Sequence, residues 1–193
     1  MTTETVELDG LGLAYGDAAR IDGVISPEAV ELGGQTYVPD PEEAAFRLDV
    51  SRTSAGYALR LRFEVGLAGP CMRCLEPAVA AVKVDAREVD QPPEPATGRR
   101  AEAAAEDEED ELTATELVSP YVENGVLNVL GWTHDALILS LPNQILCRPG
   151  CLGLCPGCGE SLNGADPADH EHGQAIDPRW AKLRDLAEGP PEG

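Results

Sequence analysis

Residues 57–67 read YALRLRFEVGL. Apolar side chains stand at every second position of this stretch, and charged side chains stand at several of the positions between them. This period of two is typical of a strand with one buried and one exposed face. Leu48 and Val50 begin a similar alternation before the turn-forming residues 54–56, and residues 82–87 continue it further along the chain. The sequence therefore predicts an antiparallel meander of three strands joined by short links.

Around this meander we expect an α+β fold, with a mainly antiparallel, barrel-like β core and a few short helices. Proline and capping residues mark the expected helix ends, and short apolar runs mark the remaining strands. The expected flanking elements are a strand over 5–8, a helical turn at 26–28, a strand over 125–130, a helix over 132–141 and a helix over 177–187.

An acidic segment interrupts the pattern between residues 91 and 113. Its residues 102–111 contain seven acids and no base. Such a run buries too little apolar surface to offset the entropy lost on ordering, which predicts a disordered linker or a long loop. We therefore expect three parts: residues 1–90 with the meander, the segment 91–113, and residues 114–189, which pack on the first part as one domain.

The charge balance excludes several classes of partner. Among 193 residues, 14 Lys and Arg stand against 35 Asp and Glu, a formal net charge of −21. This argues against a general nucleic-acid coat, which must neutralise phosphates, and against docking on an anionic membrane. The chain has no signal-peptide pattern at its start and no apolar run long enough to span a bilayer, so we expect a cytoplasmic protein without membrane contact.

The six cysteines carry the sharpest chemical signal. In the cytoplasm disulfides are rare, so clustered cysteines point to metal binding. Two C-x-x-C pairs, Cys71 with Cys74 and Cys155 with Cys158, are each able to direct two thiolates at one ion. Four sulfurs in a tetrahedron form a closed structural zinc site. The first choice for the ligands of a structural Zn²⁺ is therefore Cys71, Cys74, Cys155 and Cys158. Each C-x-x-C turn is then a zinc knuckle, and the pair of knuckles joins two distant parts of the α+β fold.

Other uses of the cysteines stay open at this point. Cys147 and Cys151 can replace the second pair, can close a site with Cys155 and Cys158 alone, or can be buried small side chains. A thiol-redox or iron–sulfur role is the alternative function. His170 and His172 fit a solvated loop better than a ligand pair. No known catalytic motif occurs in the sequence, so we do not expect an enzyme.

The cysteine segments resemble a known family. The segment CMRCLEP at 71–77, the segment LCRPGCLGLCPGCG at 146–159 and Leu162-Asn163 are similar to the YceD family of bacterial and plastid proteins. That family is named for the accumulation of large-subunit ribosomal RNA, and the resemblance extends from about Leu48 to the helix expected near Trp180. It implies a role in ribosome biogenesis without an established reaction: a non-enzymatic, zinc-stabilised accessory factor for the large subunit.

The expected partner is a basic ribosomal protein or a precursor of the large subunit, since an acidic surface attracts a basic protein. A local exception to the acidity lies between residues 44 and 87, where seven Lys or Arg meet four acids. Some of these basic residues can share one outer face of the meander and contact RNA locally. An ordinary solvated sheet surface is the favoured interpretation of that face. The basic residues concerned are Arg60, Arg62, Arg73, Lys83 and Arg87.

Overall fold

The computed structural model describes residues 2–92 and 117–172. The chain divides into two compact units, residues 1–149 and residues 150–193. The first unit contains all the named strands and helix α3 (Val129–Leu139), so it joins elements from both sides of the acidic segment. That residues 150–189 belong to the same domain stays a prediction.

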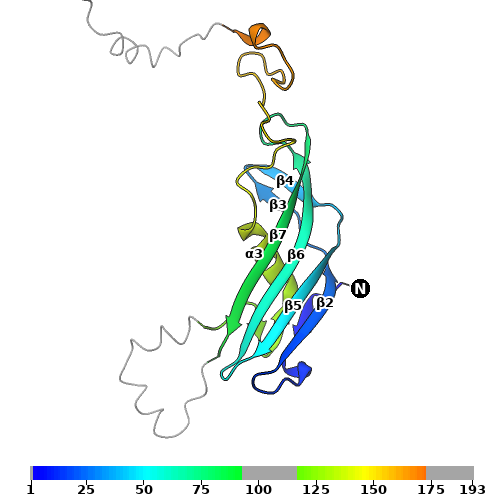
Figure 1. The fold of residues 1–193 in the computed structure, drawn as a ribbon, viewed down its shortest axis with the longest axis vertical. Helices are drawn as coiled ribbons and strands as arrows, with labels where there is room; N and C mark the ends of the chain where they lie inside the picture. Colours follow the sequence, from blue (N-terminus) through cyan, green and yellow to red (C-terminus); the bar gives the residue numbers. More distant parts are fainter. Residues whose placement is uncertain (1, 93–116, 173–193) are drawn as a thin grey trace, which may run out of the picture. The chain divides into compact units, whose positions relative to one another are not determined.

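The first unit is built on a six-stranded antiparallel sheet. Its strands pair in the order β2-β5-β6-β4-β3, and β7 pairs with the other edge of β6. Figure 1 shows β5, β6 and β7 side by side, which confirms the predicted meander. The strands are β2 (Ala18–Ile25), β3 (Val30–Leu32), β4 (Gln35–Pro39), β5 (Ala44–Arg52), β6 (Tyr57–Pro70) and β7 (Pro77–Asp90).

The expectation of a barrel-like core is wrong, because the sheet is open. A barrel requires that the first and last strands pair with each other. In the described part of the chain, β2 pairs with β5 and β7 pairs with β6, so the two outer strands do not meet. The apolar face of the sheet is buried in another way: α3 packs against β7, and Figure 1 shows this helix behind the long strands.

A small second sheet and α3 complete the first unit. The sheet has the order β1-β9-β8, formed by β1 (Thr5–Glu7), β9 (Val126–Asn128) and β8 (Val122–Glu123). Helix α3 begins three residues earlier than the sequence predicts because the side chain of Asn128 accepts a hydrogen bond from the N–H of Gly131 at 2.9 Å. It ends at Leu139, before Pro142, as the proline requires.

The core confirms which face of the meander is buried. Leu48, Leu61 and Leu67 are fully buried, and Trp132 and Leu137 of α3 join them. The charged residues between these positions lie on the opposite face, as a period of two requires. The polypeptide from Ser26 to Glu28 links β2 to β3 without a helical turn, so the turn expected there is wrong.

Two expectations fall outside the described residues: the helix over 177–187 and almost all of the acidic segment. A short 3-10 helix, Asp9–Leu11, follows β1, and another, Pro167–His170, lies in the second unit. Within residues 2–92 and 117–172, no helix combines the length and apolar character needed to cross a membrane.

Candidate metal centres

The first C-x-x-C pair forms the turn between β6 and β7. Pro70 and Pro77 are the last paired residues of the two strands, and Cys71 to Glu76 make the loop. The N–H of Cys71 donates to the carbonyl oxygen of Glu76 at 2.7 Å, and the N–H of Leu75 donates to the carbonyl of Cys71 at 3.0 Å. These two bonds fold the backbone around the sulfur of Cys71.

Backbone N–H groups stabilise the thiolate form of Cys71. The N–H of Arg73 lies 3.5 Å from Sγ of Cys71. Burial by itself would raise the pKa of Cys71, but hydrogen bonds from the backbone N–H groups of Cys74, Arg73 and Cys147 outweigh burial and lower the pKa to about 6. The thiolate is the form that binds a metal ion, so the turn favours the ligating state.

A third cysteine reaches the turn from the segment that follows α3. The N–H of Met72 donates to the carbonyl of Ile145 at 2.9 Å, and the N–H of Ile145 lies 3.3 Å from the thioether sulfur of Met72. Ile145 is buried, which fixes this segment against the turn. As a result, Sγ of Cys147 lies 3.5 Å from Sγ of Cys74, and the sulfurs of Cys71, Cys74 and Cys147 lie within 4.8 Å of one another.

Tyr37 of β4 supports the end of the hairpin. Its hydroxyl donates a hydrogen bond to the carbonyl oxygen of Pro70 at 2.8 Å, directly before Cys71, and its side chain is fully buried. Burial, followed by the nearby charge of Cys71, raises the pKa of Tyr37, so the phenol stays protonated and remains a donor. The hydrogen bond from Tyr37 therefore fixes the backbone directly before Cys71.

In the second unit, Asn163 organises the loop that carries Cys151. Its side-chain oxygen accepts from the N–H of Leu152 at 2.9 Å, and its Nδ2 lies 3.4 Å from Sγ of Cys151. The N–H of Leu162 donates to the carbonyl of Gly153 at 2.8 Å. Cys151 is fully buried. These contacts give a structural reason for the Leu162-Asn163 pair in the sequence motif.

The second C-x-x-C pair repeats the geometry of the first. The N–H of Cys155 donates to the carbonyl of Glu160 at 2.7 Å, and the N–H of Gly159 donates to the carbonyl of Cys155 at 2.8 Å. Gly159 has a φ of 78°, and Leu75, at the matching position of the first turn, has a φ of 64°. Hydrogen bonds from the backbone N–H groups of Cys158 and Gly157 lower the pKa of Cys155 to about 6.

The structure groups the cysteines differently from the first choice made from the sequence. Cys71 and Cys74 share a group with Cys147, one of the alternates, whereas Cys155 and Cys158 belong to a different group with His170 and His172. Sequence reasoning assigned both histidines to a solvated loop. Their spacing of one intervening residue is shorter than that of zinc-finger histidines, so the sequence held no standard signal for them.

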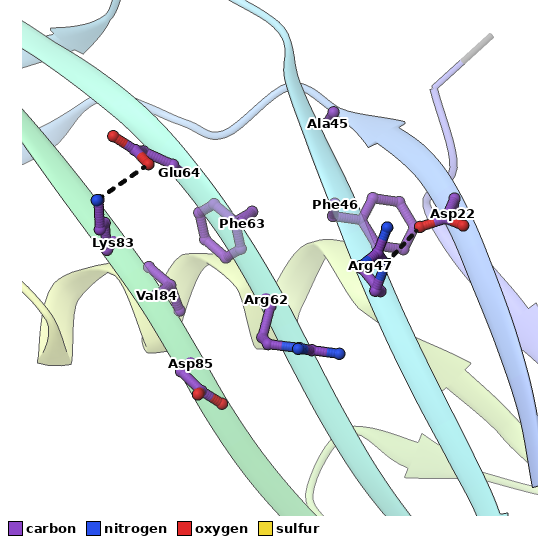
Figure 2. A pocket seen from close by; sticks show the side chains of 10 residues that line it. All are labelled: Asp22, Ala45, Phe46, Arg47, Arg62, Phe63, Glu64, Lys83, Val84 and Asp85. Atoms are coloured by element: carbon purple, nitrogen blue, oxygen red, sulfur yellow. Dashed lines mark hydrogen bonds and ion pairs between the residues drawn. The ribbon is translucent and has the colours of Figure 1, made fainter.

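The predicted basic face is an exposed surface of the main sheet. Figure 2 shows part of it, a shallow hollow of about 450 Å³ over β2, β5, β6 and β7. Three cations and three acids line this hollow, so their formal charges cancel. The charged residues that line it are Asp22, Arg47, Arg62, Glu64, Lys83 and Asp85.

Most cations on this face already have acidic partners. Arg60 donates two hydrogen bonds to Asp85, at 2.8 and 2.6 Å, and Arg62 pairs with Asp49. Nζ of Lys83 lies 3.7 Å from Glu64, a contact drawn in Figure 2. A phosphate would compete with these carboxylates for the same donors. The pairing therefore favours the interpretation of this face as an ordinary solvated sheet surface.

Comparison with known proteins supports the family resemblance that the cysteine motifs indicate. Over residues 59–187 the chain matches the family described as large ribosomal RNA subunit accumulation protein YceD. Uncharacterized proteins of Mycobacterium bovis and Mycobacterium tuberculosis are each 33% identical over 185 residues, covering 94% of this chain and 80% of theirs. No solved structure matches. The family match spans about two thirds of the sequence and includes all six cysteines, and the chain therefore belongs to the YceD family.

Proposed function

We propose that this protein is a cytoplasmic, non-enzymatic accessory factor for the large ribosomal subunit, acting in the accumulation of its ribosomal RNA. The observation that carries the proposal is the match to the YceD family over residues 59–187, a family described by that process. The match includes the knuckle at 71–74 and the second cysteine segment, which are the most specific parts of the sequence.

We propose further that a structural zinc ion binds at the knuckle of the β6–β7 hairpin. Two Zn–S bonds of about 2.3 Å at a tetrahedral angle place their sulfurs about 3.8 Å apart. The separation of 3.5 Å between the sulfurs of Cys74 and Cys147 is close to this value, and it is far longer than the S–S bond of about 2.05 Å in a disulfide. The spacing supports shared coordination of an ion.

The proposed ligands within the first unit are the thiolates of Cys71, Cys74 and Cys147. Thiolates are typical ligands of structural zinc, and zinc so bound would join the segment after α3 to the hairpin.

The partner that fits best is a basic ribosomal protein. With a net charge of −21, long-range attraction steers a basic protein toward this chain and repels bare RNA over most of its surface. The face predicted to be basic is largely neutralised by Asp49, Glu64 and Asp85, so these acids compete with phosphates for its cations.

Sedimentation of cell extract through a gradient tests the proposal. We expect the tagged protein to sediment with precursors of the large subunit at low salt and to leave them at high salt. Raising ionic strength from about 0.1 M to 1 M shortens the Debye length from about 10 Å to 3 Å and so weakens attraction between exposed charges. Western blotting of the fractions and identification of cross-linked proteins provide the measurement.

A variant with Arg60→Gln and Lys83→Gln provides a matched control on the basic face. It should sediment as the wild type does, because a basic protein partner binds acidic surface instead. The proposed function fails if the protein stays at the top of the gradient at every salt concentration. The choice of a protein partner fails if purified ribosomal RNA alone binds tightly at physiological salt.

A further inference from the structure

The described part of the second unit, residues 150–172, has almost no hydrophobic core. Among those of its residues whose burial is described, only Cys151, Gly153 and Cys155 are buried, and two of these three are cysteines. A segment with so little buried apolar surface is commonly stabilised by a disulfide or a metal ion. Its sulfurs are therefore candidates for that role.

Two histidines approach the second knuckle from a separate turn. The side chain of Asp166 accepts from the N–H of Ala168 at 3.0 Å and caps the 3-10 helix Pro167–His170. The N–H of His172 then donates to the carbonyl of His170 at 2.9 Å, which tightens the chain beyond the helix. Both imidazoles are thus held by a local backbone turn, and they lie edge to face with ring centroids 6.0 Å apart.

The ring of His172 lies directly against the knuckle at Gly157. A Cβ atom added at Gly157 would come within 2.5 Å of Cδ2 of His172, so only glycine leaves room for the ring at this distance. Gly157 also directs its N–H at Sγ of Cys155, at 3.4 Å. The same residue therefore shapes the thiolate environment and admits the imidazole.

The donor atoms are spaced as ligands of one ion. Sγ of Cys158 lies 3.4 Å from Nδ1 of His170, and the ligand atoms of Cys155, Cys158, His170 and His172 all lie within 4.8 Å of one another. A Zn–S bond of about 2.3 Å and a Zn–N bond of about 2.05 Å at a tetrahedral angle place sulfur and nitrogen about 3.5 Å apart.

We propose that Cys155, Cys158, His170 and His172 form a second metal site that binds Zn²⁺ and folds the second unit around it. Two thiolates and two imidazoles are a common ligand set of structural zinc, and this mixture of soft sulfur and nitrogen donors disfavours Mg²⁺ and Ca²⁺. The protein thus holds two zinc ions of different ligand composition. This site is independent of the proposed role at the ribosome.

The zinc content of full-length variants tests the second site. We expect wild-type protein to hold two zinc ions per chain after desalting, and the double variant His170→Ala/His172→Ala to hold one. Glu171→Gln, which changes the exposed residue between the two histidines, is the matched control and should retain both ions. Because the histidines lie outside the first unit, their loss should leave the unfolding transition of that unit in place.

X-ray absorption at the zinc edge identifies the ligands. Zn–N distances of about 2.0–2.1 Å are distinct from Zn–S distances of about 2.3 Å. Wild-type protein should show both sulfur and nitrogen neighbours of zinc, and the double histidine variant should show no nitrogen from imidazole. The proposal is overturned if the double variant keeps the zinc content of the wild type, or if wild-type zinc has only sulfur neighbours.

Discussion

Cys147→Ser should remove one zinc ion per chain and lower the free energy of unfolding by several kcal/mol. The unfolded chain has no preformed site, so the energy of zinc binding is partly folding energy. Sγ of Cys147 is 3.5 Å from Sγ of Cys74, and the segment before it pairs with the tip of the knuckle through Met72 and Ile145. Loss of several kcal/mol is large against the roughly 5–15 kcal/mol of a typical domain.

Elemental analysis and urea denaturation of the same samples provide the measurement. Cys74→Ser should have the same effect as Cys147→Ser, because both residues belong to one group of sulfurs. The pairing of Cys71 and Cys74 with Cys155 and Cys158 predicts instead that Cys147→Ser retains the metal. Retention of the full metal content and stability in Cys147→Ser therefore contradicts the site. Iron and sulfide in place of zinc favours the alternative of an iron–sulfur protein.

Leu61→Ala should destabilise the first unit by about 2–5 kcal/mol, the usual cost of removing a large buried aliphatic side chain. Leu61 lies in the middle of β6, is 0% exposed, and faces Leu48 and Ala86 on the two neighbouring strands. The truncation therefore leaves a cavity between side chains of β5 and β7 on the buried face of the sheet. The midpoint of urea denaturation, followed by circular dichroism, measures the change.

Leu139→Ala is the matched control for this substitution. Leu139 is 86% exposed at the end of α3, so the same change of side chain removes little buried surface. Its effect should stay within about 0.5 kcal/mol. Equal effects of the two substitutions would show that β6 is not the centre of the core.

The sequence predicted the meander well because its signal is local. Alternating residues in 57–67 define the two faces of β6 without knowledge of any partner. Short links also predicted correctly that β5 and β7 flank it. Whether a sheet closes into a barrel depends on which outer strands meet, and this is decided by packing on α3 and on the segments far away in sequence. The alternating pattern alone therefore could not show that the sheet stays open.

The two C-x-x-C turns were also predictable from the sequence, but the side chains that lie close to them were not. The C-x-x-C spacing marks two turns that fold in the same way around their sulfurs. That Cys147 lies close to the first turn depends on the contact between Met72 and Ile145, residues 73 positions apart that carry no recognisable motif. The two histidines depend on a short 3-10 helix and on the space above Gly157, neither of which periodicity reveals.

A metal-stabilised protein that supports accumulation of large-subunit ribosomal RNA should leave less of that RNA when it is absent. The ratio of large-subunit to small-subunit ribosomal RNA in cells that lack the protein measures this directly. We expect this ratio to fall in such cells, to be restored by the wild-type chain and by Glu171→Gln, and not to be restored by Cys147→Ser. An unchanged ratio in cells without the protein, compared with wild-type cells grown at the same temperature, would contradict the proposed function.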